Sequence, residues 1–329
     1  MFKNLIAKLF TVSLITTSFL ILISNHIVEA TSSESTESTL DKISEVEEKI
    51  MEYDVITGET KEVNMEKLRQ TLKASNYIQN ADSISTNVPI SLNSSNVTRT
   101  AYTSSSVTLP GVTLITNRME APYKYTCRVV CDPEGDIACY GTAALVAPNL
   151  AITAAHNIWD KDNNYRVRSD WTIYPGFYEN SYLNGASGWS KVYYSNLWQE
   201  TGKNEYDWAI CVLNNDLGTS CGFYPTRSYT YNLGLYGRSV SVVGYPGDYM
   251  NWGFDIKARY PYQFSGKINQ VENNWFAMPA YCCIGFSGSP IFESDGVMVG
   301  ILIASSLDSS ITYGVRITSS MIDIISSHL

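Results

Sequence analysis

The most informative stretch of this 329-residue chain is Gly285-Phe286-Ser287-Gly288-Ser289-Pro290. It lies between two apolar runs, residues 275–284 and 291–292. A serine between glycines can occupy a tight turn that exposes its hydroxyl while nearby backbone N–H groups point to one place, as the nucleophile of an acyl transfer requires. An ordinary Gly/Ser loop between strands has the same composition. The hexapeptide therefore indicates a nucleophile only if the chain also offers a base.

Only one of the three histidines is suitably placed to be that base. His26 belongs to the N-terminal targeting segment, and His328 is the penultimate residue. His156 follows the apolar run 143–155, whose pattern predicts two short strands around a Pro-Asn turn. A histidine after a core strand is more often structural than catalytic, but the small residues of Thr153-Ala154-Ala155 leave room beside it for other groups.

An aspartate lies between the histidine and the serine in an apolar setting, Tyr206-Asp207-Trp208-Ala209-Ile210. The pattern predicts a strand with Asp207 embedded in it, and an isolated buried carboxylate is costly unless it is bound. Backbone donors at a strand edge would also satisfy it. The chain order His156, Asp207, Ser287, at intervals of 51 and 80 residues, makes the three together more specific than any one alone.

This order resembles the chymotrypsin-like (trypsin-fold) serine proteases, as do Thr-Ala-Ala-His at residues 153–156 and the hexapeptide at 285–290. Further motifs narrow the resemblance to the V8-like branch, the bacterial glutamyl endopeptidases. They are Tyr-Asp-Trp-Ala-Ile at 206–210, Gly-Tyr-Pro-Gly-Asp at 244–248, Gly-Val-Arg-Ile-Thr at 314–318, and Ile-Thr-Asn at 115–117 followed by Ala-Pro-Tyr at 121–123. The resemblance covers residues 107–329 and implies an all-β fold of two six-stranded antiparallel β-barrels with a C-terminal helix.

Roles for the three residues follow from the chemistry and the resemblance together. His156 is the general base, Asp207 orients its imidazole, and Ser287 is the nucleophile. The backbone N–H groups of Gly285 and Ser287 would form the oxyanion hole, the pair of donors that binds the developing negative oxygen. This chemistry needs no metal or organic cofactor, and the sequence leaves a structural calcium ion open.

The candidates for substrate binding surround the nucleophile. Cys282 and Cys283 are either a wall of the specificity pocket or part of a buried strand, and the bulky Phe286 is predicted to narrow the cleft. Leu302 stands where the glutamyl endopeptidases place a histidine that meets the substrate carboxylate. Since leucine cannot hydrogen-bond a carboxylate, we expect a neutral or apolar P1 residue, the residue before the scissile bond, instead of glutamate.

The first 30 residues read as a targeting segment. Two early lysines precede the apolar run 9–23, and Val28-Glu29-Ala30 offers a cleavage point, which is typical of a secretory signal peptide. A membrane anchor is the alternative, but the run is short for a span and no second apolar segment follows. The mature protein is therefore expected to be secreted and extracellular.

Residues 31–106 contain no Cys, Trp or Phe, and helix-compatible sequence occurs at 40–51 and 65–72. Such a segment cannot bury much of a core by itself. A disordered linker or a surface stalk fits this composition, whereas the family resemblance favours a removable pro-segment. The protease domain is then residues 107–329, with the mature chain beginning near residues 105–107.

The remainder of the chain has short strand-like runs separated by turn signals, which favours an all-β sandwich or barrel. The runs are residues 107–109, 127–130, 171–174, 192–194, 208–213, 239–243 and 297–303. Apolar positions 321, 322, 324 and 325 predict a terminal helix over residues 319–329.

Charge and cysteine content constrain partners and covalent structure. Residues 107–329 carry 19 acidic and 14 basic side chains without a basic stripe, so nucleic acid is not an expected partner. Protein or peptide substrates and an activating protease are expected, and the domain is expected to be a monomer without a membrane anchor after signal cleavage.

The seven cysteines are an odd number for an exported chain, so at least one is unpaired or intermolecular. Disulfides are predicted between Cys211 and Cys221 and between two of Cys127, Cys131 and Cys139. A zinc site is the competing interpretation, but the one available histidine is already assigned and no Cys-x-x-Cys motif is present.

Two functions fit these features. One is a serine endopeptidase made as a precursor. The other is a trypsin-fold binding protein or toxin that is catalytically weak or inactive, which Phe286 and Leu302 favour. The intact set of His156, Asp207 and Ser287 favours the enzyme.

Overall fold

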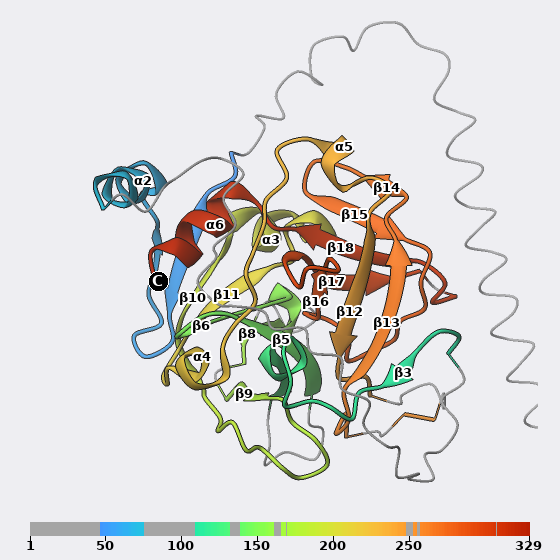
Figure 1. Cartoon of the computed structure of the whole chain (residues 1–329). Coiled ribbons are helices and arrows are strands. Elements are labelled where there is room, and N and C mark those ends of the chain that lie inside the picture. The colour runs from blue at the N-terminus through green and yellow to red at the C-terminus, as the bar shows by residue number, and fades with distance from the viewer. Residues whose placement is uncertain are drawn as a thin grey trace, which may run out of the picture. The chain divides into compact units, whose positions relative to one another are not determined.

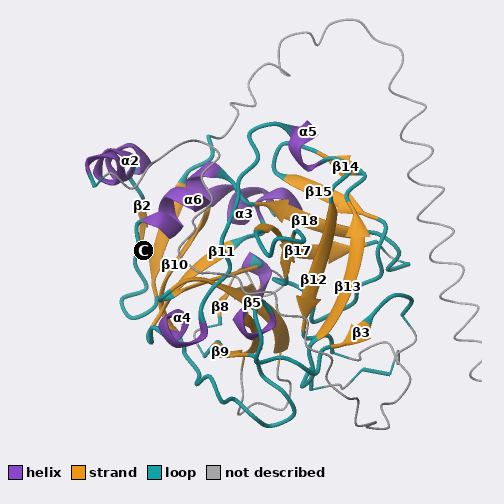
Figure 2. Cartoon of the chain, in the orientation of Figure 1, coloured by secondary structure: helices purple, strands orange, loops and turns teal. Residues whose placement is uncertain are grey.

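The computed structural model describes residues 47–75, 109–131, 139–160, 166–168, 170–247, 253–254, 257–306 and 308–329. The described residues from 48 onward form one compact unit that is built mainly of two antiparallel sheets (Figures 1 and 2). The expected signal peptide and the expected mature N-terminus lie outside the described residues. In the part of the chain that is described, no helix is long and apolar enough to cross a membrane.

The first sheet contains the strand that leads to His156. Its order is β2 (Thr60–Glu62), β1 (Ile50–Asp54), β10 (Trp189–Ser195), β11 (Ala209–Leu213), β6 (Leu150–Thr153), β5 (Cys139–Ala147), β4 (Thr126–Cys131) and β9 (Thr172–Pro175). The turn Pro148-Asn149 joins β5 to β6, as the sequence predicts, because proline and asparagine suit a tight turn. A separate ribbon pairs β7 (Trp159–Asp160) with β8 (Arg166–Val167).

The second sheet contains the strands on either side of the Gly/Ser hexapeptide. Its order is β14 (Gln270–Val271), β15 (Trp275–Met278), β18 (Thr312–Arg316), β17 (Met298–Ser305), β16 (Pro290–Phe292), β12 (Ser239–Gly244), β13 (Tyr262–Lys267) and β3 (Thr113–Leu114). The helices are α2 (Met65–Ala74), α3 (Asn196–Thr201), α4 (Leu217–Cys221), α5 (Asn232–Leu235) and α6 (Ser319–Ser326), and the short 3₁₀ turns are η1 (Tyr123–Tyr125), η2 (Ala155–Asn157) and η4 (Asn204–Tyr206).

Apolar side chains from both sheets meet in one core. Ile152 and Ile210 of the first sheet belong to the same buried cluster as Met298 and Ile301 of the second. The predicted C-terminal helix is confirmed as α6, and it buries Met321, Ile324 and Ile325 in this cluster. Each sheet also has a core of its own.

The two β halves of the expected fold are present, but each sheet has eight strands instead of six. Two of the additional strands, β1 and β2, come from the segment that the sequence places before the protease domain. Residues 40–51 look helix-compatible, yet the described part of that run enters strand β1. Pairing along the edge of β10 outweighs the local pattern here. The helix expected over residues 65–72 is confirmed as α2.

The disulfide between Cys211 and Cys221 is not formed, because both residues are free thiols. Cys211 lies in the middle of β11 and Cys221 ends α4, and both pack as small apolar side chains in the core of the first sheet. Cys127 is a free thiol as well. The second predicted disulfide was between two of Cys127, Cys131 and Cys139, so only the pair Cys131–Cys139 remains. These two residues lie opposite each other in β4 and β5, but the Cys139 side chain is outside the described residues.

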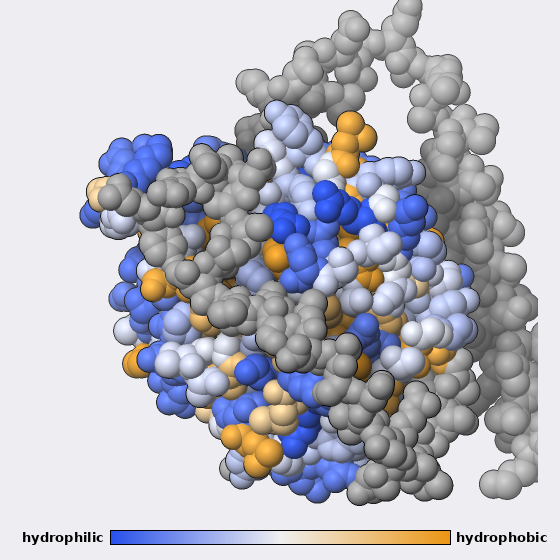
Figure 3. Space-filling model, viewed as in Figure 1, coloured by the Kyte–Doolittle hydropathy of each residue, from blue (hydrophilic) through white to orange (hydrophobic). Residues whose placement is uncertain are grey.

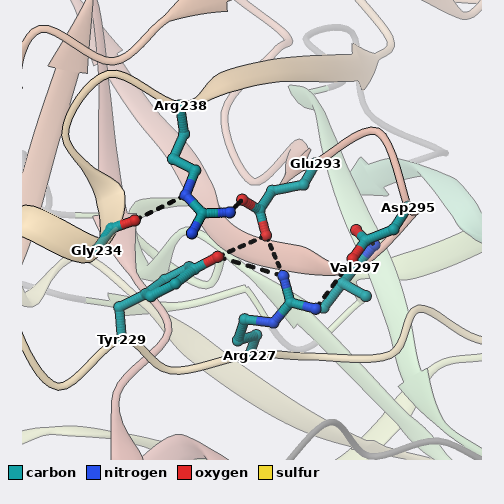
Figure 4. A network of polar contacts seen from close by, with 7 residues as sticks. All are labelled: Arg227, Tyr229, Gly234, Arg238, Glu293, Asp295 and Val297. Atoms are coloured by element: carbon teal, nitrogen blue, oxygen red, sulfur yellow. Dashed lines mark hydrogen bonds and ion pairs between the residues drawn. The ribbon is translucent and has the colours of Figure 1, made fainter. Parts of the chain in front are cut away.

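An ion-pair network fixes the connection between the two sheets (Figure 4). Arg227 and Arg238 both bind the carboxylate of Glu293, and the Tyr229 hydroxyl donates to the same group at 2.8 Å. Asp295 accepts from the other arm of Arg227 at 2.9 Å. The Glu293 side chain is only 7% exposed, so this carboxylate depends on its partners.

Candidate active site

His156 and Asp207 lie side by side because their strands are neighbours. His156 follows β6 in turn η2, Asp207 lies two residues before the start of β11, and β6 pairs with β11. The imidazole Nδ1 is 2.6 Å from Asp207 Oδ2, and the backbone N–H of His156 donates to Asp207 Oδ1 at 2.9 Å. Both oxygens of the carboxylate therefore orient the histidine.

Asp207 lies at the end of η4 and not within a strand, which corrects the expectation from sequence. Its side chain is 3% exposed, whereas that of His156 is 33% exposed. Desolvation of the imidazole lowers the pKa of His156, but the charge and hydrogen bond of Asp207 outweigh it and raise the pKa above the ordinary 6.5. The pair thus has a buried acceptor and an accessible ring.

The Gly/Ser hexapeptide forms a turn between β15 and β16 that only glycine permits at two positions. Gly285 has φ +95° and Gly288 has φ +84°, in the left-handed region that other residues rarely adopt. A side chain at Gly285 would also collide with the backbone of Tyr245 and Gly247. Phe286 between them is fully buried and packs edge-on against Phe264.

Two buried residues that the sequence analysis missed tie this turn to the first sheet. Thr142 donates its N–H to the Ser287 carbonyl at 2.9 Å, and its hydroxyl donates to the Gly285 carbonyl at 2.8 Å while accepting from the Tyr245 N–H at 2.9 Å. Asn157, next to His156, donates Nδ2 to the Ser287 carbonyl at 2.9 Å. These contacts tie the Ser287 backbone to Thr142 and to Asn157, the residue after His156. The sequence signal that could have identified Thr142 and Asn157 is that each is a polar residue at an end of an apolar run.

The expected oxyanion donors are both unengaged. Among the described residues, the N–H groups of Gly285 and Ser287 donate to no protein acceptor. The neighbouring Ile284 carbonyl is held by the Gly247 N–H at 3.0 Å. No hydrogen bond joins the Ser287 hydroxyl to His156 within the described part of the chain, and such contacts often tighten only when substrate binds.

The four predicted substrate-binding residues all contribute to the core of the second sheet. Leu302 bonds to the turn of the hexapeptide through its backbone, accepting from Gly288 N–H at 2.7 Å and donating to the Ser289 carbonyl at 2.9 Å. Burial raises the pKa of the Cys282 thiol to about 11, although Thr312 and Ser305 hydrogen-bond to it. Phe286 is buried away from solvent, so it anchors the turn and does not narrow a cleft.

The comparisons with known proteins agree with a trypsin fold. Residues 141–301 match the family model described as a trypsin-like peptidase domain. Among solved structures, a Glu endopeptidase in complex with MPD superposes with a TM-score of 0.56 at 23% identity, covering 67% of this chain and 98% of that chain. The protease Anisep of Arthrobacter nicotinovorans superposes with a TM-score of 0.52 at 18% identity, covering 62% and 96%. Identities this low show the fold alone.

A curated relative is named "Extracellular metalloprotease" and comes from Bacillus subtilis (strain 168). It is 28% identical over 209 residues, which are 63% of this chain and 64% of that protein. The chain thus spans less than two thirds of the relative's length. The described residues include no group of three or more His, Cys, Asp or Glu side chains that could hold a metal ion.

Proposed function

We propose that the protein is a serine endopeptidase that uses His156, Asp207 and Ser287. The observation that carries the proposal is the doubly bonded His156–Asp207 pair next to a glycine turn that presents a serine. The imidazole takes the Ser287 proton as the hydroxyl attacks a peptide carbonyl, and it returns the proton to the leaving amine. Asp207 holds the imidazole tautomer and stabilises the imidazolium. Water then hydrolyses the acyl-enzyme by the same steps.

The oxyanion of each tetrahedral intermediate would be bound by the N–H groups of Gly285 and Ser287. Their lack of protein acceptors supports this role, because an oxyanion hole must keep its donors available. The anchors at Thr142 and Asn157 fix the carbonyls around these donors, so little reorganisation is needed during the reaction.

We propose a neutral or apolar P1 residue. Leu302 offers no hydrogen bond from its side chain, and the Cys282 thiol stays neutral because of its raised pKa. A substrate carboxylate placed near these residues would be a buried charge without a partner, which is costly. The resemblance to glutamyl endopeptidases therefore concerns the fold and the catalytic motifs more than the substrate.

We also propose that the enzyme is secreted and made as a precursor. The apolar run 9–23 with its flanking lysines supports export, and the curated relative carries the word "extracellular" in its name. On this account residues 1–30 are removed during export, and cleavage near residues 105–107 separates the pro-segment 31–106 from the protease domain.

The test is cleavage of a proteome-derived peptide library by the purified protein, with Ser287→Ala as the inactive variant and Ser289→Ala as the matched control. Mass spectrometry of the products should show cleavage by the parent and by Ser289→Ala, and none by Ser287→Ala. Neutral residues should precede the cuts. Predominant cleavage after glutamate would contradict the proposed specificity.

The competing function is a trypsin-fold protein that binds a target without cutting it. A parent protein whose products equal those of Ser287→Ala would favour this binder. Cleavage that survives in Ser287→Ala but is abolished by a chelator such as 1,10-phenanthroline would instead indicate metal chemistry and would refute the serine mechanism.

A further inference from the structure

Residues 48–75 belong to the segment assigned to the pro-segment, yet β1 and β2 are strands of the first sheet and α2 packs beside α6 (Figure 1). We propose that this segment remains bound after the chain is cut within residues 76–108, as a noncovalent subunit of the mature enzyme. The inference rests on the proposed precursor processing. Its partner surface is the edge of β10 together with the neighbouring side of α6.

β1 is hydrogen-bonded to β10 along its whole length. β1 pairs antiparallel with β10 over five register positions, from Ile50 opposite Ser195 to Asp54 opposite Lys191. Two further bonds extend the ladder, since the Asn196 N–H donates to the Lys49 carbonyl at 3.0 Å and the Val55 N–H to the Ser190 carbonyl at 2.9 Å. Loss of the segment would leave β10 as an unpaired edge strand, which exposes a row of backbone groups.

Both faces of β1 contact apolar cores. Ile50 is buried in the cluster that joins the two sheets, and Met51 and Tyr53 pack against the core of the first sheet. The ring centroids of Tyr53 and Trp189 are 6.5 Å apart. A strand held on both faces and along its edge has the contacts by which peptides bind through β-strand addition.

Helix α2 adds a second area of contact. Met65, Leu68 and Leu72 lie on one side of the helix, with Leu72 buried, and Met65 and Leu68 pack against the core cluster that includes α6. Arg69 Nε lies 2.7 Å from Asp323 Oδ2 of α6. The remaining surface of α2 is largely hydrophilic (Figure 3). The helix is therefore amphipathic, with its apolar side turned toward the protease domain.

Charged groups across the contact are complementary. Glu52 of β1 lies 3.0 Å from the Lys191 Nζ of β10 and 3.0 Å from Lys61 of its own hairpin, and it is 9% exposed. Burial raises the pKa of Glu52, but the two lysines outweigh it and keep the carboxylate ionised. A cavity of about 340 Å³ remains between α2 and the surface formed by Tyr193 and Ile324.

The docked segment also reaches toward the catalytic aspartate. The Glu48 carboxylate hydrogen-bonds to Ser195 and is close enough to Glu205 of η4 for the two charges to repel. Asp207 caps the end of η4. Strand β11 starts two residues after Asp207 and pairs with β10. The segment therefore supports the sheet that positions Asp207.

The test uses the full chain with a recognition sequence for a site-specific protease inserted within residues 76–108, and with Ser287→Ala to prevent self-cleavage. After cutting, size-exclusion chromatography and mass spectrometry should find both pieces in one peak at low micromolar concentration. Separate elution of the two pieces in native buffer would overturn the proposal. Because the measurement uses the Ser287→Ala chain, its outcome does not depend on whether the protein is a protease.

A charge-reversal pair tests the mode of contact. Arg69→Asp should weaken the association of the cut pieces about tenfold, and adding Asp323→Arg should restore it. Lys73→Asp, on the exposed side of α2, is the matched control and should leave the affinity unchanged. Equal weakening by Arg69→Asp and Lys73→Asp, without rescue, would contradict the docking described here.

Discussion

The hydroxyl of Thr142 should contribute more to the stability and the proposed activity of this protein than a buried threonine hydroxyl usually does. In Thr142→Val the shape is kept and the backbone N–H still binds the Ser287 carbonyl, but the Tyr245 N–H and the Gly285 carbonyl lose their partner. Each buried polar group left unbound costs about 1–3 kcal/mol. For the two groups together we therefore expect the free energy of unfolding to fall by about 2–6 kcal/mol, measured by urea denaturation.

The same change should reduce catalysis, because the Gly285 carbonyl anchors one side of the oxyanion turn. Complete loss of an oxyanion donor costs about 10²–10³ in kcat, and a loosened donor should cost part of this, about 10–100-fold. The assay is kcat and KM on a peptide identified from the library. Thr142→Ser keeps the hydroxyl and should behave as the parent. A destabilised Thr142→Val with parental kcat would refute the link between this anchor and the oxyanion hole.

Further variants test other parts of the site and fold. Asp207→Asn should lower kcat by about 10⁴ with the fold retained, as checked by circular dichroism, and near-parental kcat would contradict its role. Because neutral His156 is the base and its pKa is raised, kcat/KM of the parent should fall as the pH drops through a value above 6.5, whereas an inflection below 6.5 would contradict the pairing. Ser289→Ala removes a buried hydroxyl that has no hydrogen-bond partner among the described residues, so its free energy of unfolding should be unchanged or higher by about 1 kcal/mol, and a clear loss would be unexpected. Glu293→Gln should cost about 3 kcal/mol of unfolding free energy, against less than about 1 kcal/mol for the half-exposed Asp295→Asn, and equal losses would contradict the account of that network.

Local patterns in the sequence were sufficient where short-range physics decides the structure. The Pro148-Asn149 turn and α6 follow from turn chemistry and apolar spacing, and the two sheets follow from the runs of strand-like residues. The order and spacing of His156, Asp207 and Ser287 predicted that the three act together. In the structure His156 and Asp207 are in contact.

What the sequence did not reveal depends on contacts between distant segments. Strand β1 exists because the edge of β10 is available to it, which no local pattern encodes. The anchors of the nucleophile turn, Thr142 and Asn157, bond to residues more than 100 positions away. From sequence, Phe286 was expected to narrow the cleft. Its side chain instead packs against Phe264 of β13, a contact that the local sequence does not reveal.

The central claim is that Ser287 is an activated nucleophile, and covalent labelling tests it most directly. The purified protein is incubated with a fluorophosphonate probe and digested, and the modified peptide is sequenced by mass spectrometry. The account predicts one adduct on Ser287, formed in the parent and in Ser289→Ala and absent from Asp207→Asn within the same time. No adduct in the parent, or an adduct that forms equally fast without Asp207, would contradict it.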